Sequence, residues 1–133
     1  MSRLDENLGS VGYDNLINGV YPPAEVFSVT VRKGTAAATY KRGTVLAISS
    51  GTAGDGKLVA LGTAAATNET LTANCVLAED VEVGTEEDAT AIAYRTGHFN
   101  ENTLIVAASY TLKAADKEAL RSAGILLSDA VEI

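Results

Sequence analysis

The chain has 133 residues, a formal net charge of −7 and hydrophobic side chains at 47% of its positions. This length suits one domain, and this hydrophobic content excludes an intrinsically disordered protein. An acidic surface repels phosphate groups, which argues against nucleic acid as a partner. No apolar run is long enough to span a membrane, and the N-terminus has no apolar signal core. We therefore expect a soluble protein that is made in a cytoplasm and does not enter a membrane.

Residues 1–24 differ in composition from the rest of the chain. They are rich in glycine and asparagine and end near the pair Pro22-Pro23, which favours an extended backbone. We therefore predict a flexible N-terminal arm over 1–24 and a β-rich domain over 25–133. The arm carries enough apolar side chains to bind a partner surface.

The first clear strand pattern covers residues 26–32, where Phe27, Val29 and Val31 alternate with polar residues. This period of two is typical of a half-buried strand. Further short strands are predicted over residues 44–48, 57–61, 75–78, 81–83, 89–94 and 104–106. The segments between them are predicted as a link at 34–39, a turn at 49–57, a loop at 62–73 and a bend at 97–100.

One helix is predicted over residues 112–123, because small and apolar residues recur there at helical spacing. Thr111 is the expected N-terminal cap, and Gly124 is the expected left-handed residue that ends the helix. Many short strands and one late helix indicate a mainly β protein with a small barrel-like domain.

One segment of the sequence partly matches the motif of a nucleotide-binding site. Gly51-Thr52-Ala53-Gly54-Asp55-Gly56-Lys57 has the spacing of a phosphate-binding loop, but Leu58 follows where that motif requires serine or threonine. A strand also follows where the motif requires a helix, so a hairpin turn explains the glycines better.

No catalytic or metal-binding set is evident, so we predict neither enzyme activity, nor a cofactor, nor a metal. Cys75 lies in an apolar strand and is expected to be a buried small hydrophobe, and the single histidine, His98, lacks neighbouring ligands in the sequence. The acidic run at 79–88 has no regular calcium-loop spacing and is expected to be a solvated edge.

An ordered series of short motifs in the second half resembles the lambda-type head decoration proteins of tailed phages. The series begins with Val76-Leu77-Ala78-Glu79-Asp80-Val81 and continues with the strand that ends in Gly97-His98-Phe99-Asn100. It closes with the helix end Ala119-Leu120-Arg121-Ser122-Ala123-Gly124-Ile125. Together these motifs cover roughly residues 75–128.

The resemblance implies a β-tulip domain that forms a homotrimer on the outside of the expanded capsid of a virion. It also implies an N-terminal arm that pairs with a strand of the major capsid protein and a mechanical role in stabilising the head. The arm itself cannot be aligned with the family. Its expected capsid-binding residues are therefore chosen for their apolar character and their position near the arm's exit: Tyr13, Leu16, Ile17, Val20, Tyr21, Val26, Phe27, Val29 and Val31.

Two alternatives remain open at this stage. A head-fibre base or a module that attaches to host glycans would also be trimeric, although the absence of tryptophan argues against a sugar site. An enzyme would have to use His98, Cys75 or Asp55, which are the residues best suited to chemistry.

Overall fold

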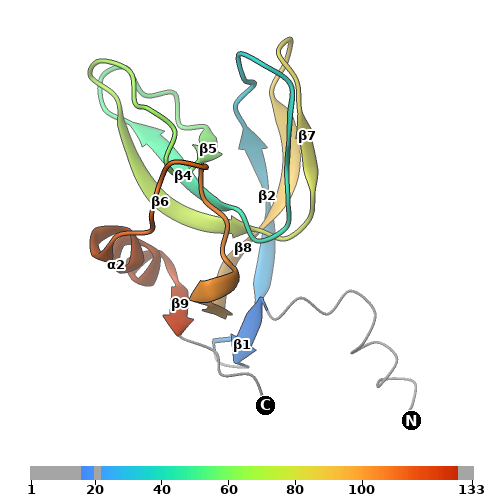
Figure 1. Cartoon of the computed structure of the whole chain (residues 1–133), viewed down its shortest axis with the longest axis vertical. Coiled ribbons are helices and arrows are strands. Elements are labelled where there is room, and N and C mark those ends of the chain that lie inside the picture. The colour runs from blue at the N-terminus through green and yellow to red at the C-terminus, as the bar shows by residue number, and fades with distance from the viewer. Residues whose placement is uncertain (1–15, 20–21, 129–133) are drawn as a thin grey trace.

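The computed structural model describes residues 16–19 and 22–128. Its centre is a closed barrel of five strands: β2 (Glu25–Val31), β4 (Val45–Ser50), β5 (Leu58–Ala60), β6 (Thr70–Leu77) and β8 (Ala89–Asn100). β2 pairs with β5 in parallel, and β5–β4, β4–β6, β6–β8 and β8–β2 are antiparallel (Figure 1). The predicted class, a mainly β barrel-like domain with one late helix, is confirmed.

The barrel interior holds one of two hydrophobic cores. Val29 and Val31 of β2 point inward, as the alternation in the sequence predicts, and meet Leu46, Cys75 and Leu77. A separate two-stranded ribbon, β3 (Ala38–Tyr40) and β7 (Val81–Val83), contributes its apolar side chains to this core. The ribbon therefore helps to close the barrel.

The second core lies on the outer face of β4, β5 and β6. Val45 and Val76 point out of the barrel there and pack with Phe99, Leu120 and Ile125. Helix α2 (Ala114–Ala123) supplies Leu120, its one buried residue. Both faces of this part of the sheet are covered by other residues. The side chains of β4 are therefore buried along almost the whole strand, instead of only at every second position.

Helix α2 begins two residues later than predicted. Its N-terminal cap is Lys113 and not Thr111, and the Lys113 amide donates to the carboxylate of Asp116 at 3.0 Å. Asp116 thus stabilises the first turn through both its charge and its hydrogen bond. The helix ends as predicted, since Gly124 has a φ of 113° in the left-handed region.

A small sheet forms at one end of the barrel. The last four residues of β8 pair in parallel with β9 (Ile125–Ser128) and, on the other side, antiparallel with β1 (Ile17–Gly19). The short 3-10 helix η1 (Glu101–Thr103) follows β8 directly. In Figure 1, β1 and β9 both lie at the lower end of the molecule.

Four predictions about local structure are wrong. The predicted link at 34–39 ends at 37, because Ala38 to Tyr40 pair with β7. The predicted bend at 97–100 is strand, because β1 and β9 pair with it. The predicted loop at 62–73 ends at 69, because Thr70 to Ala73 pair with β4. The predicted strand at 104–106 is limited to one bridge between Ile105 and Thr44.

Two other predictions hold. Residues 51–57, which partly match a phosphate-binding loop, form the hairpin between the antiparallel strands β4 and β5. Cys75 is buried inside the barrel. Within the described ranges no helix is long and apolar enough to cross a membrane.

Candidate interaction surface

The end sheet of β1, β8 and β9 is the candidate site, because the N-terminal segment joins the folded body there. Leu16 is 2% exposed and packs into the outer core, and its carbonyl accepts a hydrogen bond from the Asn100 amide at 2.8 Å. Leu16 is thus part of the folded body. Residues 16–19 of the predicted arm lie in the end sheet, and the arm boundary at residue 24 stays a prediction.

β1 can lie flat against β8 only because residue 19 is a glycine. A Cβ atom at Gly19 would lie 2.5 Å from Nδ1 of His98, well inside contact distance. On its other side, His98 Nε2 lies 2.8 Å from the Ser128 hydroxyl of β9. His98 therefore contacts both strands that flank β8.

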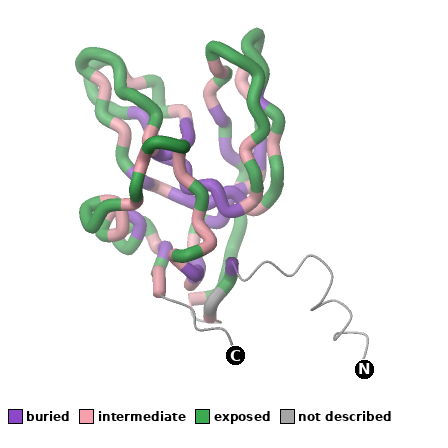
Figure 2. The backbone as a smooth tube through the Cα atoms, viewed as in Figure 1, coloured by how far each residue is buried: buried purple, intermediate pink, exposed green. Residues whose placement is uncertain are grey.

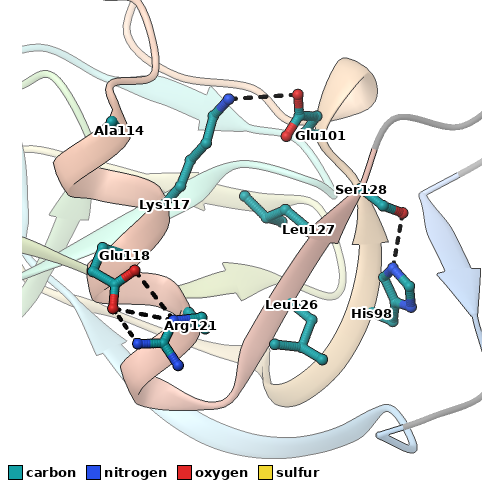
Figure 3. Close-up of a pocket in the computed structure, with 9 residues that line it drawn as sticks. All are labelled: His98, Glu101, Ala114, Lys117, Glu118, Arg121, Leu126, Leu127 and Ser128. Carbon is teal, nitrogen blue, oxygen red and sulfur yellow. Dashed lines mark hydrogen bonds and ion pairs between the residues drawn. The ribbon is translucent and has the colours of Figure 1, made fainter.

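A groove lies between helix α2 and β9. It has a volume of about 520 Å³, and Leu126 and Leu127 contribute its apolar surface (Figure 3). Charged side chains line it in two pairs, Lys117 with Glu101 at 3.4 Å and Glu118 with Arg121. Since the first pair is partly exposed and the second fully exposed, each contributes little to stability.

Exposed apolar side chains are found near this end and on the barrel. Ile17 of β1 is 43% exposed, Leu126 of β9 is 37% exposed, and Val26 at the start of β2 is 52% exposed. Among the described strands, β1 pairs only with β8, so its outer edge has no strand partner within the described ranges. An edge of this kind can accept an extended segment of another protein.

The predicted binding residues fall into three groups. Leu16, Val29 and Val31 fill the two cores, so their side chains are not available to a partner, and Phe27 is half-buried beneath the Arg95 guanidinium at 5.2 Å. Ile17 and Val26 are exposed. Tyr13, Val20 and Tyr21 lie outside the described residues.

Residues that the sequence analysis did not select also contribute to this surface. Leu126 follows a buried isoleucine in a strand of four residues, which is too short for a clear alternation. The groove depends on how α2 and β9 pack, and no local pattern reports that packing.

The residues named for an enzyme are distributed over different parts of the fold. Cys75 is inside the barrel, and burial raises the pKa of its thiol to about 12, so it is not a nucleophile at neutral pH. Asp55 lies in the β4–β5 hairpin, where the Arg32 guanidinium lowers its pKa to about 2.

His98 and Ser128 have the spacing of a base and a nucleophile, but a third group is needed to orient the histidine. Gly19 occupies the Nδ1 side. No group of three metal-ligating side chains occurs within the described ranges. This geometry suits a surface that binds a partner by shape and backbone pairing.

Comparison with protein families agrees with this geometry. The family model of bacteriophage lambda head decoration protein D matches residues 14–126. The match begins two residues before Leu16 and ends in β9, so it covers the barrel, the helix and most of the end sheet. No curated protein matches the chain. The match covers most of the chain, which therefore belongs to the family of bacteriophage lambda head decoration protein D.

Proposed function

We propose that this protein is a capsid cement that binds the outer surface of the expanded phage head as a homotrimer and stabilises it. The observation that carries the proposal is the family match over residues 14–126, which spans the folded body. The partner is the major capsid protein, and the protein is made in the bacterial cytoplasm before it joins the virion. The role is structural, with no catalytic step.

The geometry supports attachment through the end sheet. Leu16, the first described residue, lies beside β8, next to the exposed Ile17 and to the edge of β1 that has no partner among the described strands. A capsid strand that pairs with these residues gains main-chain hydrogen bonds, and side-chain pockets give specificity. Three arms on one trimer multiply a weak contact, because the second and third bind at a high effective concentration.

The net charge is consistent with a site on the outside of the head. At −7 the chain gains nothing from contact with packaged DNA, whose phosphates would repel it. The binding free energy therefore has to come from apolar side chains and from backbone pairing with the capsid protein.

The test is addition of the purified protein to expanded heads that lack decoration. Bound protein should raise the temperature at which these heads release their DNA. A variant without residues 1–15 should keep the melting temperature of the free protein, because it retains every core residue that the structure describes, and should lose protection of the heads. Equal protection by the truncated variant would refute attachment through the arm, and no protection by the full chain would refute the cement role.

A further inference from the structure

A small pocket lies where β8 passes from the barrel into the end sheet. Its volume is about 200 Å³. The described residues that line it are Phe27, Asn74, Arg95, Thr96 and Ala123. Arg95 and Thr96 directly precede Gly97, where the pairing of β8 with β9 begins. We propose that this pocket binds a carboxylate side chain of the major capsid protein, an inference that rests on the proposed function.

Two β-bulges bring polar side chains to this pocket. Arg95 is an extra residue on β8, because its neighbours Tyr94 and Thr96 pair with consecutive residues of β2. Asn74 is an extra residue on β6 in the same way, because the residues on either side of it pair with consecutive residues of β4. A bulge can redirect a side chain, and bulges are common beside functional sites. Both of these bulged residues line the same pocket.

Arg95 differs from the other arginines that the structure describes. Arg32, Arg42 and Arg121 each donate side-chain hydrogen bonds to other described residues. The side chain of Arg95 forms no hydrogen bond or ion pair with any residue in the described ranges. Its guanidinium lies over the ring of Phe27, with Cζ 5.2 Å from the ring centroid. The N–H donors of Arg95 are therefore available to a partner.

The contact with Phe27 prepares Arg95 for a carboxylate. Because the ring already holds the guanidinium in place, less freedom is lost when a partner binds. The planar fork of an arginine matches the two oxygens of a carboxylate and donates two parallel hydrogen bonds to them. The amide of Asn74 can donate a third, because this half-buried side chain has no hydrogen-bond partner in the described part of the chain.

The size and the charge of the pocket limit what it can bind. Pockets for drug-sized ligands have volumes of roughly 300–1,000 Å³, so a pocket of about 200 Å³ suits a single side chain. Arg95 is the one charged residue among the described residues that line it, although the chain as a whole carries −7. The pocket is therefore a cationic point on an acidic protein and favours an anionic group.

The position of the pocket favours the capsid protein as the source of the carboxylate. The pocket adjoins the end sheet, which under the proposed function faces the capsid. Residues 23–26, which lead into Phe27, are all exposed, and Figure 2 shows this stretch rising from the lower end of the molecule. Arg95 is exposed as well. A protein bound at the end sheet can therefore reach the pocket.

The first test measures how Arg95→Gln and Lys113→Gln, each in the full chain, bind to expanded heads. Both positions are exposed, and both substitutions remove a positive charge that lies over an aromatic ring, Phe27 or Tyr110. Arg95→Gln should raise the dissociation constant about 10- to 100-fold, because charged hydrogen bonds are lost, whereas Lys113→Gln should leave it unchanged. Arg95→Lys should fall between the original protein and Arg95→Gln, since an ammonium group lacks the fork. Unchanged binding of a folded Arg95→Gln protein would overturn the proposal.

The second test identifies the partner carboxylate. In the Arg95→Lys variant, a carbodiimide joins the new amine to a carboxylate in contact with it, and an amide bond forms with loss of water. Mass spectrometry of the variant bound to heads at saturation should find position 95 linked to an aspartate or glutamate of the capsid protein, with no such link from Lys113. Links from position 95 that stay within this chain or join two copies of it, or no link at all, would contradict the proposal.

These tests separate the carboxylate site from the cement role. If the original protein binds expanded heads and Arg95→Gln binds them equally well, the carboxylate site is refuted and the cement role stands. If the original protein does not bind expanded heads, both are refuted.

Discussion

Arg32 and Glu69 are 37 residues apart in the chain, yet Nη2 of Arg32 lies 2.5 Å from Oε2 of Glu69. The same guanidinium donates two hydrogen bonds to Asp55, at 2.9 and 3.0 Å. Ser49 also donates to Glu69, at 2.5 Å. This network joins the end of β2 to the β4–β5 hairpin and to the residue that precedes β6, at the barrel end away from the arm.

The network predicts a loss of stability in acid. Hydrogen bonds and the charge of Arg32 hold the pKa values of Asp55 and Glu69 at about 2, below their ordinary values of 3.8 and 4.5. Since both are depressed in the folded state, their contribution is complete above about pH 4.5 and is lost as pH falls towards 2. Urea unfolding at several pH values should show this decline.

The variant Glu69→Gln isolates part of the acid effect. It should be less stable than the original protein at pH 7, because a charged hydrogen bond to Arg32 is lost, and its stability should fall less between pH 4.5 and 2. If both proteins lose the same free energy of unfolding over that range, Glu69 has no part in the acid response.

The contact between β1 and β8 can be tested at Gly19. A methyl group added there would lie 2.5 Å from Nδ1 of His98, so Gly19→Ala should displace β1. The Asn100 amide, which donates to Leu16, should then exchange with solvent about tenfold faster or more.

Gly84→Ala is the matched control for Gly19→Ala, because a Cβ at Gly84 meets no atom within 4 Å. This variant should leave the exchange rate of Asn100 unchanged. Equal rates in both variants would show that β1 is not held by the close approach to His98.

The two phenylalanines should differ in their contribution to stability. Phe99 is fully buried, and its ring centroid lies 5.1 Å from that of Tyr94, so Phe99→Ala should cost about 3–5 kcal/mol of unfolding free energy. Phe27 is half-buried beneath Arg95, so Phe27→Ala should cost clearly less. Denaturant unfolding measures both, and equal costs would contradict the assignment of Phe99 to the outer core.

Cys75 should be inert in the native protein. Its side chain is buried and its thiol pKa is raised to about 12, so little thiolate is present at pH 8. A chromogenic disulfide reagent should react within minutes in denaturant and only at the rate of unfolding without it. Rapid reaction of the native protein would place the thiol at an accessible surface.

The strands that the sequence predicts best are those with one buried and one exposed face. In β2, Phe27, Val29 and Val31 alternate with polar residues, and the fold follows that pattern. Gly97 and Phe99 are buried around the half-buried His98, so the same period continues through the segment predicted as a bend. Gly97 and Asn100 favour a turn by residue type. The segment is nevertheless a strand, because it pairs with β1 on one side and with β9 on the other.

The interaction surface was harder to predict, because exposure depends on packing between distant elements. Val26 and Val29 have the same side chain and lie in one strand, yet one is exposed and the other faces the barrel core. Leu16 lies in a segment without an apolar period, and its burial requires the outer core that α2 and β8 complete.

The most direct test of the central claim, that this chain decorates phage heads, is a binding isotherm measured on expanded and on unexpanded heads of the phage that encodes it. We expect saturable binding to expanded heads, at roughly one chain per capsid subunit if trimers fill every three-fold position, and little binding to unexpanded heads. The absence of saturable binding to expanded heads would contradict the account.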